Sequence, residues 1–238
     1  MDLPSIDLRL GDCLEILKDI PDNSIDLLVT DPPYDINATG RGIVTTRKYV
    51  DQIQDITNGF DANVLPELIR VLKKINLYIF CSHNQIIPLL DYFVKERGCF
   101  YTILSWHKSN PLPTCNNTYL KDTEYCLFFR EKGVKLYGTY HTKHTYYITG
   151  VNQTDKAKWG HPTIKPLNVI QNFVINSSLE GDTVLDPFTG SGTTAIACMN
   201  TNRNFLGCEI NEKYYQTALN RINETKVYKE EHLDLETE

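Results

Sequence analysis

Residues 25–34 read Ile25-Asp26-Leu27-Leu28-Val29-Thr30-Asp31-Pro32-Pro33-Tyr34. The apolar run 25–29 predicts a buried parallel strand, because strands covered on both faces are almost continuously hydrophobic. Two successive prolines end that strand, since they remove two backbone N–H donors and fix φ. In open α/β sheets ligands bind at the carboxyl ends of the strands, so the turn at 31–34 is the first candidate for a functional site.

This turn presents a carboxylate, a rigidly held carbonyl and an aromatic ring. The exocyclic amine of a nucleobase is a poor nucleophile, because its lone pair is delocalised into the ring. The Asp31 carboxylate and the Pro32 carbonyl can hold its two hydrogens, and Tyr34 can stack on a base flipped out of a duplex. We therefore take Asp31, Pro32, Pro33 and Tyr34 as candidate catalytic residues. A proline turn with a packing tyrosine explains this stretch, taken alone, equally well.

A second strand-to-turn motif lies far along the chain, at Leu185-Asp186-Pro187-Phe188-Thr189-Gly190-Ser191-Gly192-Thr193-Thr194. It follows an apolar strand at 183–185 and precedes a helical run at 195–199. Glycines at such a turn allow a ligand to approach the backbone closely. Glu209 ends the next strand about 20 residues on, the spacing expected of a carboxylate that binds ribose hydroxyls. The pattern indicates an adenosine-containing cofactor and does not say which one.

These two motifs and His161-Pro162-Thr163-Ile164-Lys165-Pro166 together resemble the S-adenosylmethionine-dependent amino-methyltransferases of DNA. The order, with the catalytic motif before the cofactor motif, resembles the beta class of that family. The resemblance covers about residues 5 to 225. It implies a Rossmann-like α/β fold, with a seven-stranded, mostly parallel, doubly wound sheet and helices on both faces.

The resemblance also implies S-adenosyl-L-methionine as cofactor. It places Glu209 at the ribose, the Gly11-Asp12 turn at the adenine and the segment 161–166 at the methionine end. Asp12 can equally cap the helix that follows it, and the two roles are compatible. The implied cofactor-binding residues are Asp12, Cys13, Asp31, His161, Thr163, Lys165, Asp186, Phe188, Gly190, Ser191, Gly192, Thr193, Thr194 and Glu209.

We expect one catalytic domain at 1–228 and a disordered acidic tail at 229–238. Residues 35–60 lack periodicity and predict a mobile flap over DNA, and 133–160 predict a small target-recognition insertion with a short hairpin from 134–137 and 145–148. The other expected strands lie at 6–10, 76–82 and 99–106, with one more through 126–129. Expected helices lie at 14–20, 64–74, 85–96, 167–174 and 214–222.

The pattern Trp106-x-Lys108-x-Asn110-Pro111, followed by Thr123-Glu124-Tyr125, also matches the family, whose members place this loop by the target base. For Trp106 we favour core packing over base stacking. Residues of the flap, of this loop and of the recognition insertion are the candidate DNA contacts. They are Arg41, Arg47, Lys48, Lys108, Asn110 and Lys143.

Composition narrows the class of protein further. The net charge of −6 argues against a uniformly basic nucleic-acid binder. Residues 105–165 nevertheless carry nine Lys or Arg against four acidic residues, which suits phosphate contact and is also compatible with an ordinary solvated surface. The seven cysteines are scattered without a C-x-x-C pair, so we expect reduced thiols and no metal site. With neither an apolar run of membrane length nor a signal peptide in view, we expect a cytoplasmic protein.

The sequence therefore predicts a site-specific methyltransferase acting on the N6 amine of adenine in double-stranded DNA. Adenine is preferred because family members with Asp before Pro-Pro-Tyr more often methylate adenine, and those with Ser more often methylate cytosine at N4. Cytosine N4, RNA or a protein amide remain alternative acceptors, and a non-catalytic DNA-binding subunit is a different class. A homodimer and a cognate restriction endonuclease are open as partners.

Overall fold

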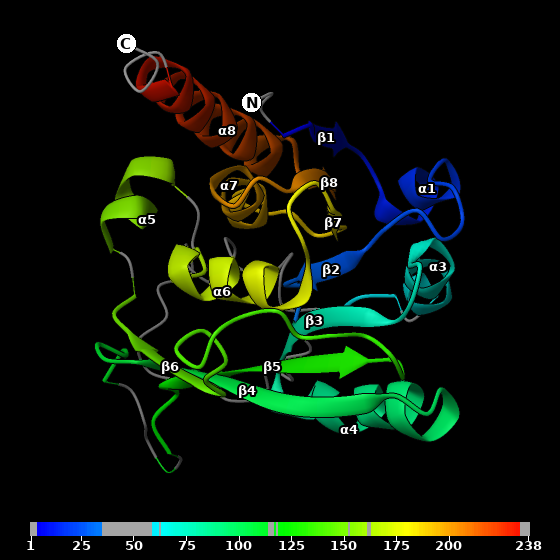
Figure 1. The fold of residues 1–238 in the computed structure, drawn as a ribbon. Coiled ribbons are helices and arrows are strands. Elements are labelled where there is room, and N and C mark those ends of the chain that lie inside the picture. Colours follow the sequence, from blue (N-terminus) through cyan, green and yellow to red (C-terminus); the bar gives the residue numbers. More distant parts are fainter. Residues whose placement is uncertain are drawn as a thin grey trace.

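The computed structural model describes residues 4–34, 59–61, 63–113, 117, 119–151, 153–160 and 163–233. This part of the chain forms one sheet with helices on both faces (Figure 1). The strands are β1 (Ile6–Leu10), β2 (Leu27–Thr30), β3 (Asn76–Cys81), β4 (Phe100–Lys108), β5 (Thr123–Arg130), β6 (Tyr146–Thr149), β7 (Thr183–Asp186) and β8 (Asn204–Glu209). The helices are α1 (Cys13–Lys18), α3 (Val64–Val71), α4 (His83–Leu90), the π-helix η2 (Asp91–Glu96), α5 (Gln153–Trp159), α6 (Leu167–Ser177), α7 (Thr193–Asn200) and α8 (Glu212–Leu233).

The eight strands lie in the order β1-β8-β7-β2-β3-β5-β4-β6. Strand β5 runs antiparallel to both of its neighbours, β3 and β4, and the other neighbouring pairs are parallel. The mostly parallel α/β sheet is thus confirmed. The expected count of seven strands is wrong, because β6 adds an eighth beside β4.

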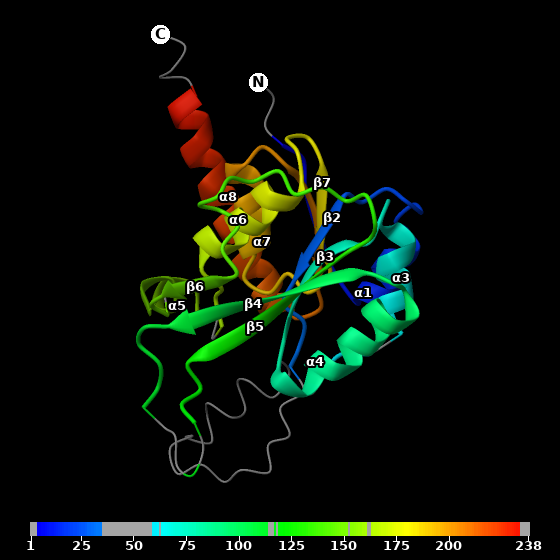
Figure 2. The same ribbon diagram turned by 60° about the horizontal axis from the view of Figure 1, so that its bottom comes forward.

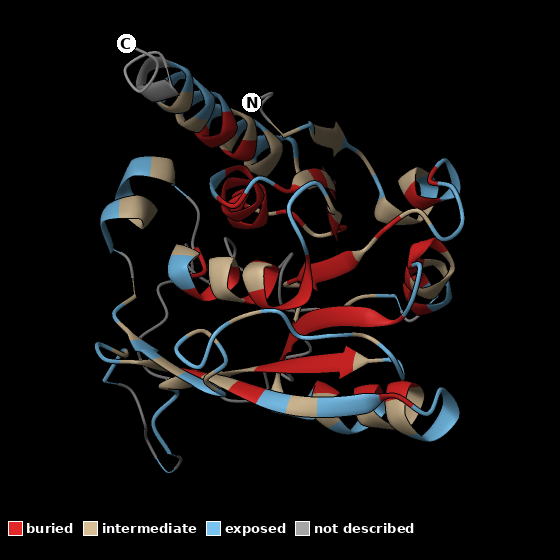
Figure 3. Ribbon diagram, in the orientation of Figure 1, coloured by how far each residue is buried: buried red, intermediate tan, exposed pale blue. Residues whose placement is uncertain are grey.

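Two hydrophobic clusters lie on the two faces of the sheet. One joins α1, α3, α4 and η2 to the sheet, and the other joins α6, α7 and α8 to the opposite face (Figure 2). Every residue of β2 and β3 is buried, as Figure 3 shows by colour. The doubly covered strand expected at 25–29 is therefore present, with its regular part at Leu27–Thr30.

Local signals explain where the helices begin. Asp12 accepts a hydrogen bond from the Leu14 N–H at 2.8 Å and caps α1. Ser82 and Gln85 form a capping box at the start of α4. Gly192 precedes α7 with φ of +80°, a left-handed conformation that glycine adopts without strain.

The prediction of a hairpin within 133–160 is wrong. Tyr146–Thr149 pairs parallel with β4, and 134–137 contains no strand. Polar contacts with α6 hold this segment instead, since Tyr137 N–H donates to the Asn176 carbonyl at 2.8 Å and Asn176 Nδ2 donates to the Thr142 carbonyl at 2.8 Å. The insertion also contains helix α5, which periodicity did not reveal.

Two helix predictions also needed correction. The helix expected at 85–96 consists of α4 followed by the π-helix η2. The closing helix is longer than 214–222 and runs from Glu212 to Leu233, so residues 229–233 of the expected tail are helical. Residues 234–238 and almost all of the expected flap lie outside the described residues. None of the helices in the described ranges has the length and apolar character needed to cross a membrane.

Candidate active site

A cavity of about 360 Å³ opens at the carboxyl ends of β1, β2, β7 and β8. These strands are parallel neighbours, so the turns that follow them meet at one edge of the sheet. Both motifs found in the sequence line this cavity, although they are more than 150 residues apart. The residues contributed by those turns include Gly11, Asp12, Asp31, Pro32, Pro33, Tyr34, Asp186, Phe188, Gly190 and Glu209.

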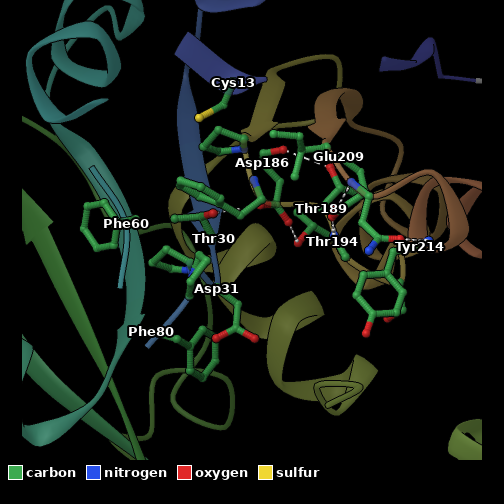
Figure 4. Close-up of a pocket in the computed structure, with 18 of the residues that line it drawn as sticks. Cys13, Thr30, Asp31, Phe60, Phe80, Asp186, Thr189, Thr194, Glu209 and Tyr214 are labelled. Carbon is green, nitrogen blue, oxygen red and sulfur yellow. Dashed lines mark hydrogen bonds between the residues drawn. The ribbon is translucent and has the colours of Figure 1, made fainter. Parts of the chain in front are cut away.

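Asp186 holds the glycine turn in place. Its Oδ1 accepts hydrogen bonds from the Thr30 hydroxyl at 2.8 Å and the Phe188 N–H at 3.2 Å, and its Oδ2 accepts one from the Thr194 hydroxyl at 2.7 Å. Burial raises the pKa of Asp186 to about 7, and the two hydroxyls offset only part of that rise. Both oxygens thus serve the protein, tying β2, β7 and α7 together (Figure 4).

Glu209 lies on the other side of the glycine turn. Its Oε2 accepts a hydrogen bond from the Gly190 N–H and its Oε1 one from the Asn211 N–H, each at 2.8 Å. Burial raises the pKa of this carboxyl, while the backbone donors oppose the rise. The cavity wall is also partly aromatic, with the ring centroids of Phe60 and Phe188 6.0 Å apart. The cavity therefore combines hydrogen-bond acceptors with flat apolar surfaces.

The catalytic candidate Asp31 lies beside Phe80, away from Glu209 (Figure 4). Its Oδ2 forms an ion pair with Lys165 Nζ. Its Oδ1 is buried and has no hydrogen-bond partner among the described residues. Leaving a buried acceptor without a hydrogen bond costs about 1–3 kcal/mol of stability, and more when the acceptor is charged. An N–H donor from a substrate would therefore recover free energy here.

Glu124 of β5 completes this end of the site. Its Oε1 pairs with Lys108 Nζ at 2.7 Å, and its Oε2 lies 3.1 Å from Lys165 Nζ and accepts a hydrogen bond from the Tyr34 hydroxyl at 3.2 Å. Burial alone would raise the pKa of Glu124, but the two lysines outweigh it and lower the pKa to about 2. Glu124 is therefore an ionised acceptor between two cations.

The turn that carries Pro32 and Pro33 is fixed from α4. Gln85 Nε2 donates a hydrogen bond to the Pro33 carbonyl at 3.2 Å, while its Oε1 accepts from the Ser82 N–H at 2.9 Å. One side chain thus caps the helix and holds the catalytic turn against it.

Most of the expected cofactor-binding residues line the cavity, and some also contact the rest of the protein. Ser191 and Thr193 line the cavity and accept hydrogen bonds from Arg221 of α8, whereas Gly192 does not line it. Trp106 is buried and donates to the Thr149 hydroxyl at 2.7 Å, as expected of a core residue. Cys13 and Thr163 line the cavity, and burial raises the pKa of Cys13 to about 11.

The six expected DNA-contacting residues fall into three groups in the structure. Lys108 faces Glu124 inside the site rather than the outer surface. Asn110 and Lys143 are exposed, and their side chains contact Val151 N–H and the Leu136 carbonyl. Arg41, Arg47, Lys48 and the cofactor candidate His161 lie outside the described residues.

Sequence reasoning missed some lining residues. Phe60 lay in a stretch without periodicity, and Phe80 looked like an ordinary strand residue. Asn211 and Tyr214 follow Glu209 so closely that they were detectable as part of the same turn. Glu124 stood in the Thr-Glu-Tyr pattern, yet nothing local to it showed that it would meet Lys165.

Comparison with known proteins identifies the same family that the sequence motifs resemble. The family model described as DNA methylase (N6_N4_Mtase) matches residues 25–220. Type II methyltransferase M2.MboI of Moraxella bovis is 27% identical over 93% of this chain and 89% of its own, and DNA adenine methyltransferase YhdJ of Escherichia coli (strain K12) is 26% identical over 94% and 84%.

Solved structures agree with these relatives. The M1.HpyAVI–SAM complex aligns with a TM-score of 0.68 at 27% identity, over 91% of this chain and 99% of the other. The cytosine-N4-specific PvuII DNA methyltransferase aligns with a TM-score of 0.67 at 19% identity, over 92% and 88%, and so shares the fold. The chain belongs to the DNA methylase family, the S-adenosylmethionine-dependent amino-methyltransferases of the N6-adenine and N4-cytosine type.

Proposed function

We propose that this protein is a site-specific DNA methyltransferase that methylates the N6 amine of adenine in duplex DNA, after the base has been flipped out of the helix. One observation carries the proposal. The partly buried Asp31 carboxylate has one oxygen without a hydrogen-bond partner among the described residues, and it lies at the same strand edge where Glu209 and the glycine turn border a cavity of cofactor size.

The cavity fits S-adenosylmethionine, the cofactor of the family. Its volume of about 360 Å³ is within the usual range of small-molecule sites. Phe60 and Phe188 offer flat surfaces for the adenine, and the Glu209 oxygens retain lone pairs for ribose hydroxyls. Asp12 reaches the same cavity while capping α1. When bound, this cofactor supplies an electrophilic methyl group on a sulfonium.

The protein contributes position and electrostatics to the transfer. Asp31 Oδ1 and the Pro32 carbonyl accept the two amine hydrogens, which localises the nitrogen lone pair. Tyr34 holds the ring. The cofactor would supply the methyl group to the nitrogen and keep the electrons of its C–S bond, and Asp31 would accept one proton from the nitrogen and pass it to solvent.

DNA contact is assigned to the segment 105–160 and to the flap. The exposed side chains of Asn110 and Lys143 are available to phosphates or base edges, and Arg41, Arg47 and Lys48 are proposed to join them. The choice of adenine rests on Asp at position 31, which accompanies adenine more often than cytosine in the family. The names of YhdJ and of PvuII methyltransferase show that the fold serves both bases.

A transfer assay tests the proposal. Protein, S-adenosylmethionine and unmethylated duplex DNA are incubated, and the DNA is digested to nucleosides and identified by mass. We expect N6-methyladenine, and a loss of at least about 100-fold in rate for Asp31→Ala. Asp91→Ala is the matched control, since Asp91 pairs with the exposed Lys95 on η2 and does not line the cavity.

Each other product has a definite meaning. If the product is N4-methylcytosine, the proposed mechanism stands and the assignment of adenine as the target base is wrong. Cofactor binding without any methylated DNA base overturns the DNA acceptor, and assays on RNA and protein amides then follow.

A further inference from the structure

Lys165 has an unusual position for a lysine. Its side chain is only 7% exposed, although a buried ammonium is costly unless it is paired. Its Nζ contacts Asp31 Oδ2, lies 3.1 Å from Glu124 Oε2, and sits 5.3 Å and 4.9 Å from the ring centroids of Tyr34 and Phe80. The ammonium is therefore at the catalytic carboxylate, away from the Glu209 end.

Two carboxylates and two lysines form a chain of alternating charge. The order is Lys108, Glu124, Lys165, Asp31, and the members come from β4, from β5, from the segment before α6 and from the turn after β2. Pro166 caps α6 directly after Lys165, and Ile164 before it is buried. Lys165 is thus anchored on both sides of the backbone and through Glu124.

We propose that Lys165 is a positioning residue of the methyl transfer: its ammonium holds the Asp31 carboxylate by Oδ2 and keeps it ionised, so that Oδ1 is left to accept the target amine. Glu124 in turn holds Lys165. This inference rests on the proposed function and differs from the cofactor-binding role that the sequence suggested for Lys165.

The physical reason is the burial of Asp31. Burial raises the pKa of Asp31, and Lys165 is the main opposing influence. Without the ammonium, the carboxyl takes up a proton at higher pH, and a protonated carboxyl presents a donor where the amine needs an acceptor. Activity without Lys165 is therefore expected to fail at neutral pH and to return as pH rises.

Other groups face the pair and must be separated from it. Burial raises the pKa values of Tyr34, Cys81 and Cys126, so these stay neutral near pH 7. Charged neighbours are Glu124, Lys108 and Lys156 of α5, and the pKa of Lys156 is lowered by burial and then by Lys108. Asp186, with a pKa of about 7, is present in every variant, so only differences between variants report on Asp31.

The test compares Lys165→Met and Lys165→Arg with Lys73→Met. Lys73 forms a 2.7 Å ion pair with Asp26, which precedes β2 as Asp31 follows it, so the control removes a Lys–Asp pair at the opposite end of the strand. Rates of methyl transfer are measured from pH 6 to pH 9, together with the Kd of S-adenosylmethionine by calorimetry.

For Lys165→Met we expect a loss of about 100-fold in kcat at neutral pH. The acid limb of its pH–rate profile should move to higher pH by at least about one unit, and its Kd for the cofactor should stay within about threefold of wild type. Lys165→Arg keeps the charge and the wild-type acid limb. Lys73→Met matches wild type. Infrared difference spectra should show the carbonyl stretch of a protonated carboxyl in Lys165→Met that is absent from Asp31→Asn/Lys165→Met.

Any of four results overturns the proposal. A cofactor Kd raised tenfold or more with an unmoved acid limb makes Lys165 a cofactor ligand, and a uniformly reduced profile makes it merely structural. If Lys165→Met does not fold, recovery of folding in the Asp31→Asn double variant supports the coupling, and no recovery refutes it. Absence of the infrared band refutes the proposal even if the wild-type protein methylates no DNA, so the proposed function fails separately.

Discussion

Glu124 carries two ion pairs on one carboxylate, and its side chain is 17% exposed. Removing its charge leaves Lys108 and Lys165 without the carboxylate between them, and Asp31 remains to pair with Lys165 alone. Glu124→Gln is therefore expected to lower the free energy of unfolding by about 3 kcal/mol at pH 7, as for other broken buried pairs. Urea denaturation measures it.

The effect has a defined pH window. The pKa of Glu124 in the folded protein is about 2, below its ordinary value of 4.5, so its contribution is complete above pH 4.5 and declines as pH falls toward 2. The matched control is Glu67→Gln, because Glu67 pairs with Arg70 at 2.8 Å on a more exposed part of α3 and should cost under about 1 kcal/mol. Equal effects of the two substitutions would contradict the buried-network interpretation.

Asp186 gives a second prediction at the residue scale, of opposite sign. Its pKa of about 7 lies above the ordinary value of 3.8, so the folded protein binds a proton that the unfolded chain has lost, and stability falls as pH rises from about 4 to 7. Asp186→Asn removes this titration. As pH rises from 5 to 8, we expect the free energy of unfolding of the variant to increase relative to that of wild type, by up to a few kcal/mol. Denaturation experiments at each pH measure this difference. A difference that is flat with pH would refute this account.

At the scale of elements, Gly192 sets how α7 packs on α8. A Cβ there would lie 3.1 Å from Ala218 Cβ and 3.2 Å from Ala218 Cα, and φ is +80°. Gly181 has a nearly equal φ of +84° with no atom within 4 Å of such a Cβ, so it isolates the backbone strain. We expect Gly181→Ala to cost about 1 kcal/mol and Gly192→Ala about 2–3 kcal/mol, measured by thermal or urea unfolding. Equal losses would mean that the helix contact yields freely.

Elements also show what a sequence can predict. The apolar runs of β2, β3 and β7 correctly predicted buried strands, because a strand that is covered on both faces carries few polar residues. Strand β6 was expected only as half of a hairpin with 134–137, because nothing in its sequence indicates that it pairs in parallel with β4 at the edge of the sheet. Helix α8 was underestimated because its outer turns pack on little and carry no apolar stripe.

The candidate site was predictable where it depended on turns and spacing. Asp31, Gly190 and Glu209 follow strand ends, and strand ends of a parallel sheet meet. The ion pairs of Glu124 with Lys108 and Lys165 were not predictable, because they join residues from three distant segments whose encounter depends on the position of β5 in the sheet. Long-range pairs of this kind leave no local signal.

At the scale of the whole molecule, the cavity lies where both halves of the chain meet, so its ligand should stabilise the global fold. At 100 times its Kd, S-adenosylmethionine is expected to add about 2.7 kcal/mol to the free energy of unfolding and so to raise Tm. NAD at the same concentration should leave Tm unchanged. The thermal shift measures both, and a shift with NAD alone would contradict the assignment of the cavity.

The neighbouring positions of β2 and β7 also affect how the protein is made. The hydrogen bond from Thr30 to Asp186 joins residues 156 positions apart. At ordinary rates of translation the ribosome needs about 8–30 s to synthesise that interval. During this time the apolar β2 has left the ribosome without one of its two partners in the sheet. We therefore expect a chaperone to protect the nascent chain until its last third emerges, and to bind it at β2.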